Sequence, residues 1–264
     1  MSAAGRGAER IESDAYSTPS WCVRRLLEAV ALPLEMPCGN PAGCDSAPCV
    51  RPAVWVEPCA GDGAIISACH GHFERISGRA MWWANEIRPE CAKALQACGV
   101  DELTCGDYLQ LPARGGDVII TNPPYSIAFE VTRKACSEAP WVALLLRLNA
   151  LGSGVESGRS VWFRGNPPDV HVLPNRPAYV ASGKCSGRQG RGRSAARGAD
   201  CGWRVTQAVR DPRVRQCPSC GAQAAWSTTD ATEYAWFVWP PWRERRAGQI
   251  TILAETSEAE RARG

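Results

Sequence analysis

The stretch Asn122-Pro123-Pro124-Tyr125 carries the residue types in this chain that are best suited to chemistry. It directly follows an apolar run, 118–121, that predicts a buried strand ending in a rigid turn. The Asn122 amide can accept a hydrogen bond from an exocyclic amine, and the carbonyl between the two prolines is fixed in direction. Two such acceptors would hold one planar amino group and direct its lone pair towards an electrophile, while the Tyr125 ring offers a face for stacking a base. Taken alone, the four residues favour a Pro-rich turn that closes a core strand, so the rest of the chain must decide.

Length and hydropathy limit the class of protein. A chain of 264 residues fits one large domain with insertions, or one domain and a small module. No run approaches the roughly 18 consecutive apolar residues that span a bilayer, and the N-terminus lacks the apolar segment of a signal peptide. We therefore expect a soluble, cytoplasmic protein with no membrane partner.

Strand and helix patterns alternate along the chain. Helical spacing of apolar residues marks 20–32, 64–69, 89–97 and 127–137, and strand patterns mark 53–56, 80–84, 103–105, 118–121 and 142–146. Alternation with short connections predicts an α/β fold with a doubly wound, mostly parallel sheet whose ligands bind at the carboxyl ends of the strands. The range 33–52 reads as an irregular, Cys-bearing loop insert, and 1–13 and 255–264 read as flexible tails.

Four loops that follow the predicted strands would meet at one edge of this sheet. Gly61 and Gly63 permit a tight turn with close approach of the backbone to a ligand. Glu86 ends the second strand, where a carboxylate suits a ribose diol, Asp107 follows the third and Asn122 the fourth. The Gly-Asp-Gly turn matches a dinucleotide fingerprint poorly, so the expected cofactor is a nucleoside without a pyrophosphate.

Together these residues resemble the S-adenosylmethionine-dependent DNA N6-adenine methyltransferases, particularly the compact type found in bacteriophages and prophages. The segment 16–21 (Tyr-Ser-Thr-Pro-Ser-Trp) resembles that family's motif X, 57–63 (Glu-Pro-Cys-Ala-Gly-Asp-Gly) its motif I, and 122–125 its catalytic motif IV. The segments 146–151 and 229–239 also resemble that phage group. The resemblance implies a Rossmann-like methyltransferase fold within 14–180 and 228–254, with any element that reads the target after Leu151.

The resemblance also implies a role for each matched residue. Asn122 and the Pro123 carbonyl would accept hydrogen bonds from the adenine amine, Tyr125 would stack on the flipped base, and the methyl group would pass directly to N6. Catalytic roles are implied for Asn122, Pro123, Pro124 and Tyr125. Contacts with S-adenosylmethionine are implied for Tyr16, Thr18, Pro19, Glu57, Pro58, Ala60, Gly61, Gly63, Asn85, Glu86, Asp107 and Asn122.

The insert 181–227 is basic and rich in cysteine. Between residues 181 and 216 it carries nine Lys and Arg residues against two Asp, which suits phosphate contacts with DNA. The candidate DNA contacts are Arg188, Arg191, Arg193 and Arg197. Cys217 and Cys220 have the spacing of half a zinc knuckle, and Cys185 and Cys201 could complete a structural zinc site. The alternatives are a solvated loop and four free thiols.

Two further functions stay open at this level. The same Asn-Pro-Pro-Tyr site suits an amino group in RNA or the amide of a protein glutamine. A third possibility is a catalytically inactive protein that binds nucleic acid through its basic insert. The matches at 16–21 and 234–239 favour a DNA methyltransferase, and the complete segments 57–63 and 122–125 argue against an inactive protein.

Overall fold

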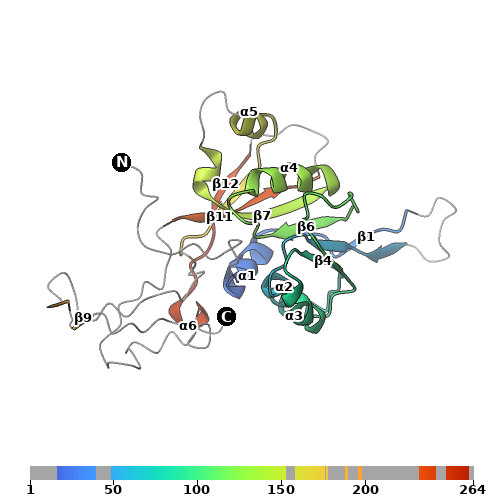
Figure 1. The fold of residues 1–264 in the computed structure, drawn as a ribbon, viewed down its shortest axis with the longest axis horizontal. Helices are drawn as coiled ribbons and strands as arrows, with labels where there is room; N and C mark the ends of the chain where they lie inside the picture. Colours follow the sequence, from blue (N-terminus) through green and yellow to red (C-terminus); the bar gives the residue numbers. More distant parts are fainter. Residues whose placement is uncertain are drawn as a thin grey trace.

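An eight-stranded sheet forms the centre of the computed structural model, which describes residues 17–39, 49–152, 158–175, 177, 188–189, 196–197, 232–241 and 248–261. The strands of this sheet are β3 (Val54–Glu57), β4 (Met81–Glu86), β5 (Glu102–Cys105), β6 (Val118–Thr121), β7 (Trp141–Arg147), β8 (Asp169–Val172), β11 (Tyr234–Trp239) and β12 (Ile250–Ile252). They lie in the order β12-β8-β11-β7-β6-β3-β4-β5 (Figure 1).

Helices cover both faces of the sheet. They are α1 (Ser20–Ala29), α2 (Ala64–Arg75), α3 (Ala92–Ala97), α4 (Ala128–Glu138), α5 (Gly158–Gly165) and α6 (Glu258–Arg261), with 3₁₀ turns η2 (Pro89–Cys91) and η3 (Leu148–Leu151). The helices α1, α2 and α3 lie on one side and α4 and α5 on the other (Figure 1). This explains why β6 is an unbroken apolar run, since a parallel strand covered on both faces has no solvent side.

The strand directions confirm a mostly parallel α/β sheet. β5, β4, β3, β6 and β7 are mutually parallel, and β12 is parallel to β8. β11 is antiparallel to both of its neighbours, β7 and β8. The carboxyl ends of β3, β4, β5 and β6 therefore share one edge, as the alternation of strand and helix predicted.

The range 33–52 differs from the irregular loop that we expected. It contains a short antiparallel hairpin of β1 (Glu35–Pro37) and β2 (Val50–Pro52), and Cys38 and Cys49 form a disulfide with their Cα atoms 5.7 Å apart. Strands of three residues that each end in proline are too short to show a period-two pattern. The preceding helix also ends at Ala29 rather than at residue 32, because Val30 is already extended.

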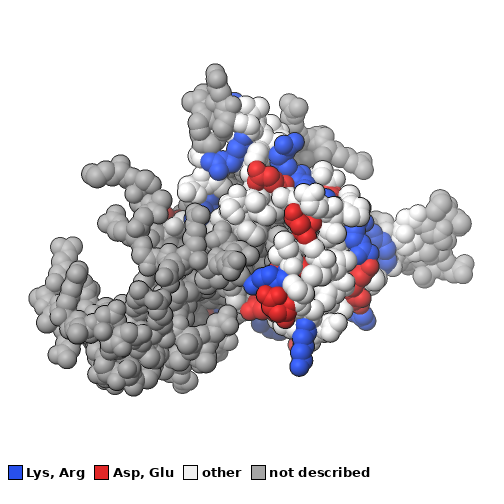
Figure 2. Space-filling view, viewed as in Figure 1, with Lys and Arg blue, Asp and Glu red and all other residues white. Residues whose placement is uncertain are grey.

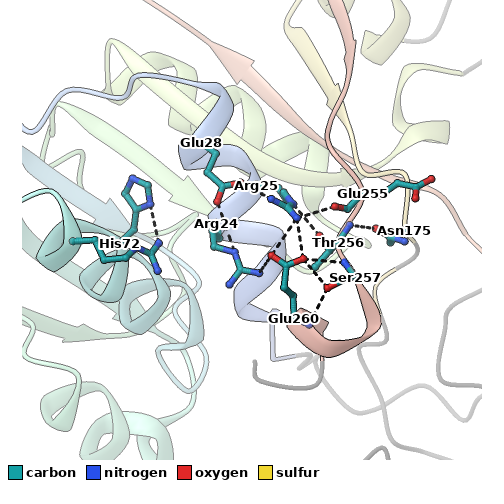
Figure 3. Close-up of polar contacts among 10 residues, drawn as sticks. Arg24, Arg25, Glu28, His72, Asn175, Glu255, Thr256, Ser257 and Glu260 are labelled. Atoms are coloured by element: carbon teal, nitrogen blue, oxygen red, sulfur yellow. Dashed lines mark hydrogen bonds and ion pairs between the residues drawn. The ribbon is translucent and has the colours of Figure 1, made fainter.

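The C-terminal segment differs from the flexible tail expected after residue 254. Thr256 is buried, and its backbone N–H donates to Asn175. Arg25 of α1 donates to the Glu255 carbonyl at 2.8 Å and to the Thr256 hydroxyl at 3.0 Å, while Glu260 lies beside the same guanidinium (Figure 3). The chain end is thus fastened to α1, the helix that begins two residues after Thr18.

We expect Arg25→Ala to lower the melting temperature by about 4–8 °C. The side chain is only 12% exposed, and hydrogen bonds from a charged donor contribute about 1.5–3 kcal/mol. Arg79→Ala is the matched control, because Arg79 is 79% exposed and its partner Asp101 is 4.0 Å away. Thermal unfolding of both variants checks the prediction, and an equal, small shift in both would contradict it.

Candidate active site

The turn after β3 is shaped by two glycines in the left-handed region. Gly61 has φ 57° and Gly63 has φ 82°, values that side chains with a Cβ rarely adopt. A Cβ on Gly63 would also lie 2.5 Å from the Cys98 sulfur, so the close packing of this turn on α3 excludes any larger residue. The turn leads directly into α2, whose N-cap residue is Gly63.

Glu86, at the end of β4, connects this turn to the second strand. One carboxylate oxygen accepts from the Gly61 N–H at 2.6 Å, and the other accepts from Arg88 Nε at 2.8 Å and from the Arg88 N–H at 3.2 Å. These donors stabilise a carboxylate that is almost completely buried. Arg88 was not among the residues expected at the site, and only its position two residues after Glu86 hints at this contact.

Asn85 connects two loops and β5. Its amide nitrogen donates to the Pro58 carbonyl at 3.1 Å and to the Gly106 carbonyl at 3.0 Å, and its amide oxygen accepts from Thr104 at 2.9 Å. Both N–H groups of the amide are thus used within the protein. Asn85 fixes the turn after β3 relative to the loop that carries Asp107, whose own carboxylate accepts from the Leu109 N–H.

Glu57 ends β3 with a buried carboxyl group that lacks part of its hydrogen bonding. The residue is 1% exposed, and its Oε2 has no hydrogen-bond partner among the described residues. Burial, and then the neighbouring charge of Asp62, raise the pKa of Glu57 well above its usual range. A buried acceptor without a donor costs about 1–3 kcal/mol, which a ligand that donates a hydrogen bond would recover.

The segment after β6 is joined to the residues that precede α1. Asn122 Nδ2 donates to the Thr18 hydroxyl at 3.1 Å, and the Tyr125 hydroxyl donates to Asn122 Oδ1 at 3.1 Å. Thr18 is buried and Asn122 is partly buried, and their contact joins residues that are 104 positions apart in sequence. The two segments expected to act together therefore meet through their side chains.

The other expected residues are distributed as follows. Pro19 caps α1, the Pro58 carbonyl accepts from Asn85, and the Pro124 carbonyl accepts from the Ile127 N–H, which starts the turn into α4. The Ala60 N–H donates to the Asn85 carbonyl, which strengthens the link between β3 and β4. Tyr16 lies outside the described residues.

The predicted zinc site and most of the basic insert also lie outside the described residues. This applies to Cys185, Cys201, Cys217, Cys220, Arg191 and Arg193. Arg188 and Arg197 are backbone partners in the two-residue strands β9 (Arg188–Gln189) and β10 (Ala196–Arg197). Within the described part of the chain, no group of three or more His, Cys, Asp or Glu side chains could hold a metal ion.

In the view of Figure 2, basic and acidic residues are interspersed over the described surface, and neither kind forms a large patch of its own. None of the helices that the structure describes has the length and apolarity needed to cross a membrane.

Comparison with known proteins finds similarity in structure but not in sequence. No protein-family model matches the chain, and no curated protein matches it. Among solved structures, the methyltransferase subunit of a type I restriction-modification system from Streptococcus thermophilus superposes with a TM-score of 0.50 and 11% identity. The match covers 80% of this chain and 46% of that one.

The fold resembles that of the Rossmann-like methyltransferases. A dimethyladenosine transferase from Plasmodium falciparum is also similar, with a TM-score of 0.45 and 10% identity over 86% of this chain and 63% of that one. In both cases the match covers less than two thirds of the other protein. At these identities the likeness concerns the methyltransferase fold alone.

The site that this methyltransferase fold positions is rich in hydrogen-bond acceptors. Glu57 and Glu86 are the last residues of β3 and β4, and Asn122 directly follows β6, so all three lie at the same edge of the sheet. The two carboxylates suit a ligand with several N–H and O–H donors. The amide of Asn122 suits a second ligand that presents an amino group.

Proposed function

We propose that this protein transfers a methyl group from S-adenosylmethionine to the exocyclic N6 of adenine in DNA. The observation that carries the proposal is the hydrogen-bonded series Thr18, Asn122 and Tyr125 at the carboxyl edge of the sheet. It joins the segment resembling motif X to the segment resembling motif IV, and it lies on the same sheet edge as the Gly61 turn and Glu86.

The residues at the edge of the sheet fit the cofactor. The buried, unpartnered Oε2 of Glu57 suits the ammonium group of its methionine part, and Glu86 suits the ribose hydroxyls. When bound, S-adenosylmethionine supplies an electrophilic methyl group on a sulfonium ion. Gly61 and Gly63 allow the backbone to approach this ligand closely, because no Cβ stands in between.

Asn122 and Pro123 act on the substrate amine. Asn122 Oδ1 has two lone pairs, one of which accepts from Tyr125, and the second is available to the amine. The Pro123 carbonyl would accept the other hydrogen, which turns the nitrogen lone pair towards the methyl group. The new N–C bond forms as the C–S bond breaks, and the surplus proton on nitrogen passes to water. Positioning of this kind can lower the barrier by about 7–11 kcal/mol without a strong base.

Binding of DNA would use the basic insert. We propose that Arg188, Arg191, Arg193 and Arg197 contact phosphates, which supplies affinity that depends on salt but not on base sequence. Extruding the adenine from the stack costs a few kcal/mol that these contacts help to offset.

Transfer of labelled methyl from S-adenosylmethionine to unmethylated DNA tests the function. After digestion to nucleosides, mass analysis should show N6-methyladenine. Label found instead in RNA, or in glutamine of a protein fraction, would replace DNA as the substrate but keep the site. Absence of label from all three, with S-adenosylmethionine bound, would contradict methyl transfer.

A further inference from the structure

Lys134 of α4 contacts the end of the loop 107–111, which follows β5. Its ammonium group donates to the Leu111 carbonyl at 2.8 Å and pairs with Glu138 Oε1, one helical turn later, at 2.9 Å. The same nitrogen lies 5.2 Å from the centroid of the Tyr108 ring, within the range of a cation–π interaction. The Lys134 side chain is only 20% exposed, so these contacts are partly shielded from water and salt.

Tyr108 attaches the beginning of the same loop to α4. Its hydroxyl donates to Glu138 Oε2 at 2.9 Å, and both side chains are almost completely buried. Burial, and then the charge of Glu138, raise the pKa of Tyr108 well above its usual range, so the hydroxyl stays protonated and remains a donor. The loop is therefore fixed to α4 near both of its ends, through a carboxylate and an ammonium group that also pair with each other.

Asp107 is the first residue of this loop, and its carboxylate is only half used there. Oδ1 accepts from the Leu109 N–H at 3.0 Å, and the Asp107 carbonyl accepts from the Leu111 N–H at 3.1 Å, so the loop forms a tight turn. Oδ2 forms no hydrogen bond within the described part of the chain. A carboxylate that is oriented through one oxygen can accept a hydrogen bond from a ligand through the other.

The Asp107 carboxylate lies near the turn that follows β3. Burial, and then charges that include those of Glu86, Glu57 and Asp107, raise the pKa of the Cys59 thiol in that turn, so the three carboxylates surround it. The proposed function assigns the cofactor's ammonium group to Glu57 and its ribose hydroxyls to Glu86. The donor of the cofactor that then remains for Asp107 is the 6-amino group of its adenine.

We infer that Lys134, together with Tyr108 and Glu138, positions Asp107 to select the adenine base of the cofactor. This inference rests on the proposed function. A loop that is already fixed before binding loses little conformational freedom when its carboxylate takes up the amine, and this strengthens the contact that distinguishes one base from another. Lys134 is a positioning residue, because it acts through the loop that carries Asp107.

Calorimetric titration with two ligands tests this role without any need for methyl transfer. The ligands are S-adenosylhomocysteine and its analogue in which hydrogen replaces the 6-amino group of the purine. The wild-type protein should bind the first at least about tenfold more tightly, because a hydrogen bond to a charged acceptor is lost with the second. In Lys134→Met, which keeps an apolar stem but lacks the ammonium group, this preference should fall to about threefold or less. A variant that was merely less stable would bind both ligands more weakly and keep the preference.

Two further variants complete the design. Lys93→Met makes the same chemical change at an exposed position on α3 and should keep the full preference. Tyr108→Phe keeps the ring but removes the donor to Glu138, so it should also reduce the preference. It takes the place of Lys134→Met if that variant does not fold.

The possible results separate two failures. If the wild-type protein prefers S-adenosylhomocysteine and folded Lys134→Met keeps that preference in full, the inference is wrong while the proposed function stands. Equal binding of both ligands by a wild-type protein that methylates DNA would overturn the inference in the same way. If the wild-type protein binds neither ligand and transfers no methyl group, the proposed function fails, and the inference fails with it.

Discussion

Replacing Asn122 with alanine should reduce the single-turnover rate of methyl transfer by about 100- to 1,000-fold, while cofactor affinity changes less than about threefold. In the proposed function the Asn122 amide is the side-chain acceptor for the substrate amine, and loss of one preorganised hydrogen-bonding group in a site typically costs this much in rate. Cofactor binding should persist because Glu86 and the Gly61 turn are held by their own contacts.

Rapid mixing with labelled S-adenosylmethionine measures the single-turnover rate, and calorimetric titration measures the affinity for the cofactor. Asn166→Ala is the matched control, because Asn166 directly follows α5 and its amide donates to the Trp162 carbonyl one turn earlier. Undiminished transfer by the Asn122 variant would exclude the mechanism, and loss of cofactor affinity in that variant would move Asn122 from the substrate to the cofactor.

Glu57→Gln should make the ligand-free protein more stable at pH 8 and weaken cofactor binding about tenfold or more. Because burial raises the folded-state pKa of Glu57, the native protein binds more protons than the unfolded chain above about pH 4.3, the ordinary pKa of glutamate. Its contribution to stability is therefore fully present below that pH and is lost as pH rises through the folded-state pKa. Glutamine has no charge to bury, so the gain at pH 8 should be at least about 1 kcal/mol.

Denaturant unfolding between pH 4 and pH 8 checks the direction of this change in stability with pH. The stability difference between the variant and the wild type should shrink as pH falls towards 4, where Glu57 is protonated in both states. Glu74→Gln, at an exposed position on α2, should show no such trend. A Glu57 variant that is less stable than the wild type at every pH would show that the carboxylate is stabilised by groups other than a bound ligand.

Local patterns in the chain account for most of the sheet. Apolar runs predicted β3, β4, β6 and β7 to within one or two residues, because a strand buried on both faces is largely apolar. The edge strand β5 was also predicted to within one residue, although it is partly exposed. The same order places Gly61, Glu86, Asp107 and Asn122 at one edge, since the carboxyl ends of parallel strands coincide.

Long-range contacts were not visible in these patterns. The fastening of Glu255 and Thr256 to Arg25 joins residues more than 200 positions apart, and a charged chain end reads as a tail when its partner is unknown. The β1 and β2 hairpin has strands of three residues, too short for a periodic signal.

The residue types of the site, their order and the sheet edge on which they fall follow from the linear sequence, because strand and helix periodicity is a local property. The contacts among those residues depend on the tertiary structure. Only there does Asn122 meet Thr18, and only there does Asn85 connect two loops with β5. Each of these contacts joins separate segments of the chain, and side-chain distances between such segments are set by how the sheet and helices pack.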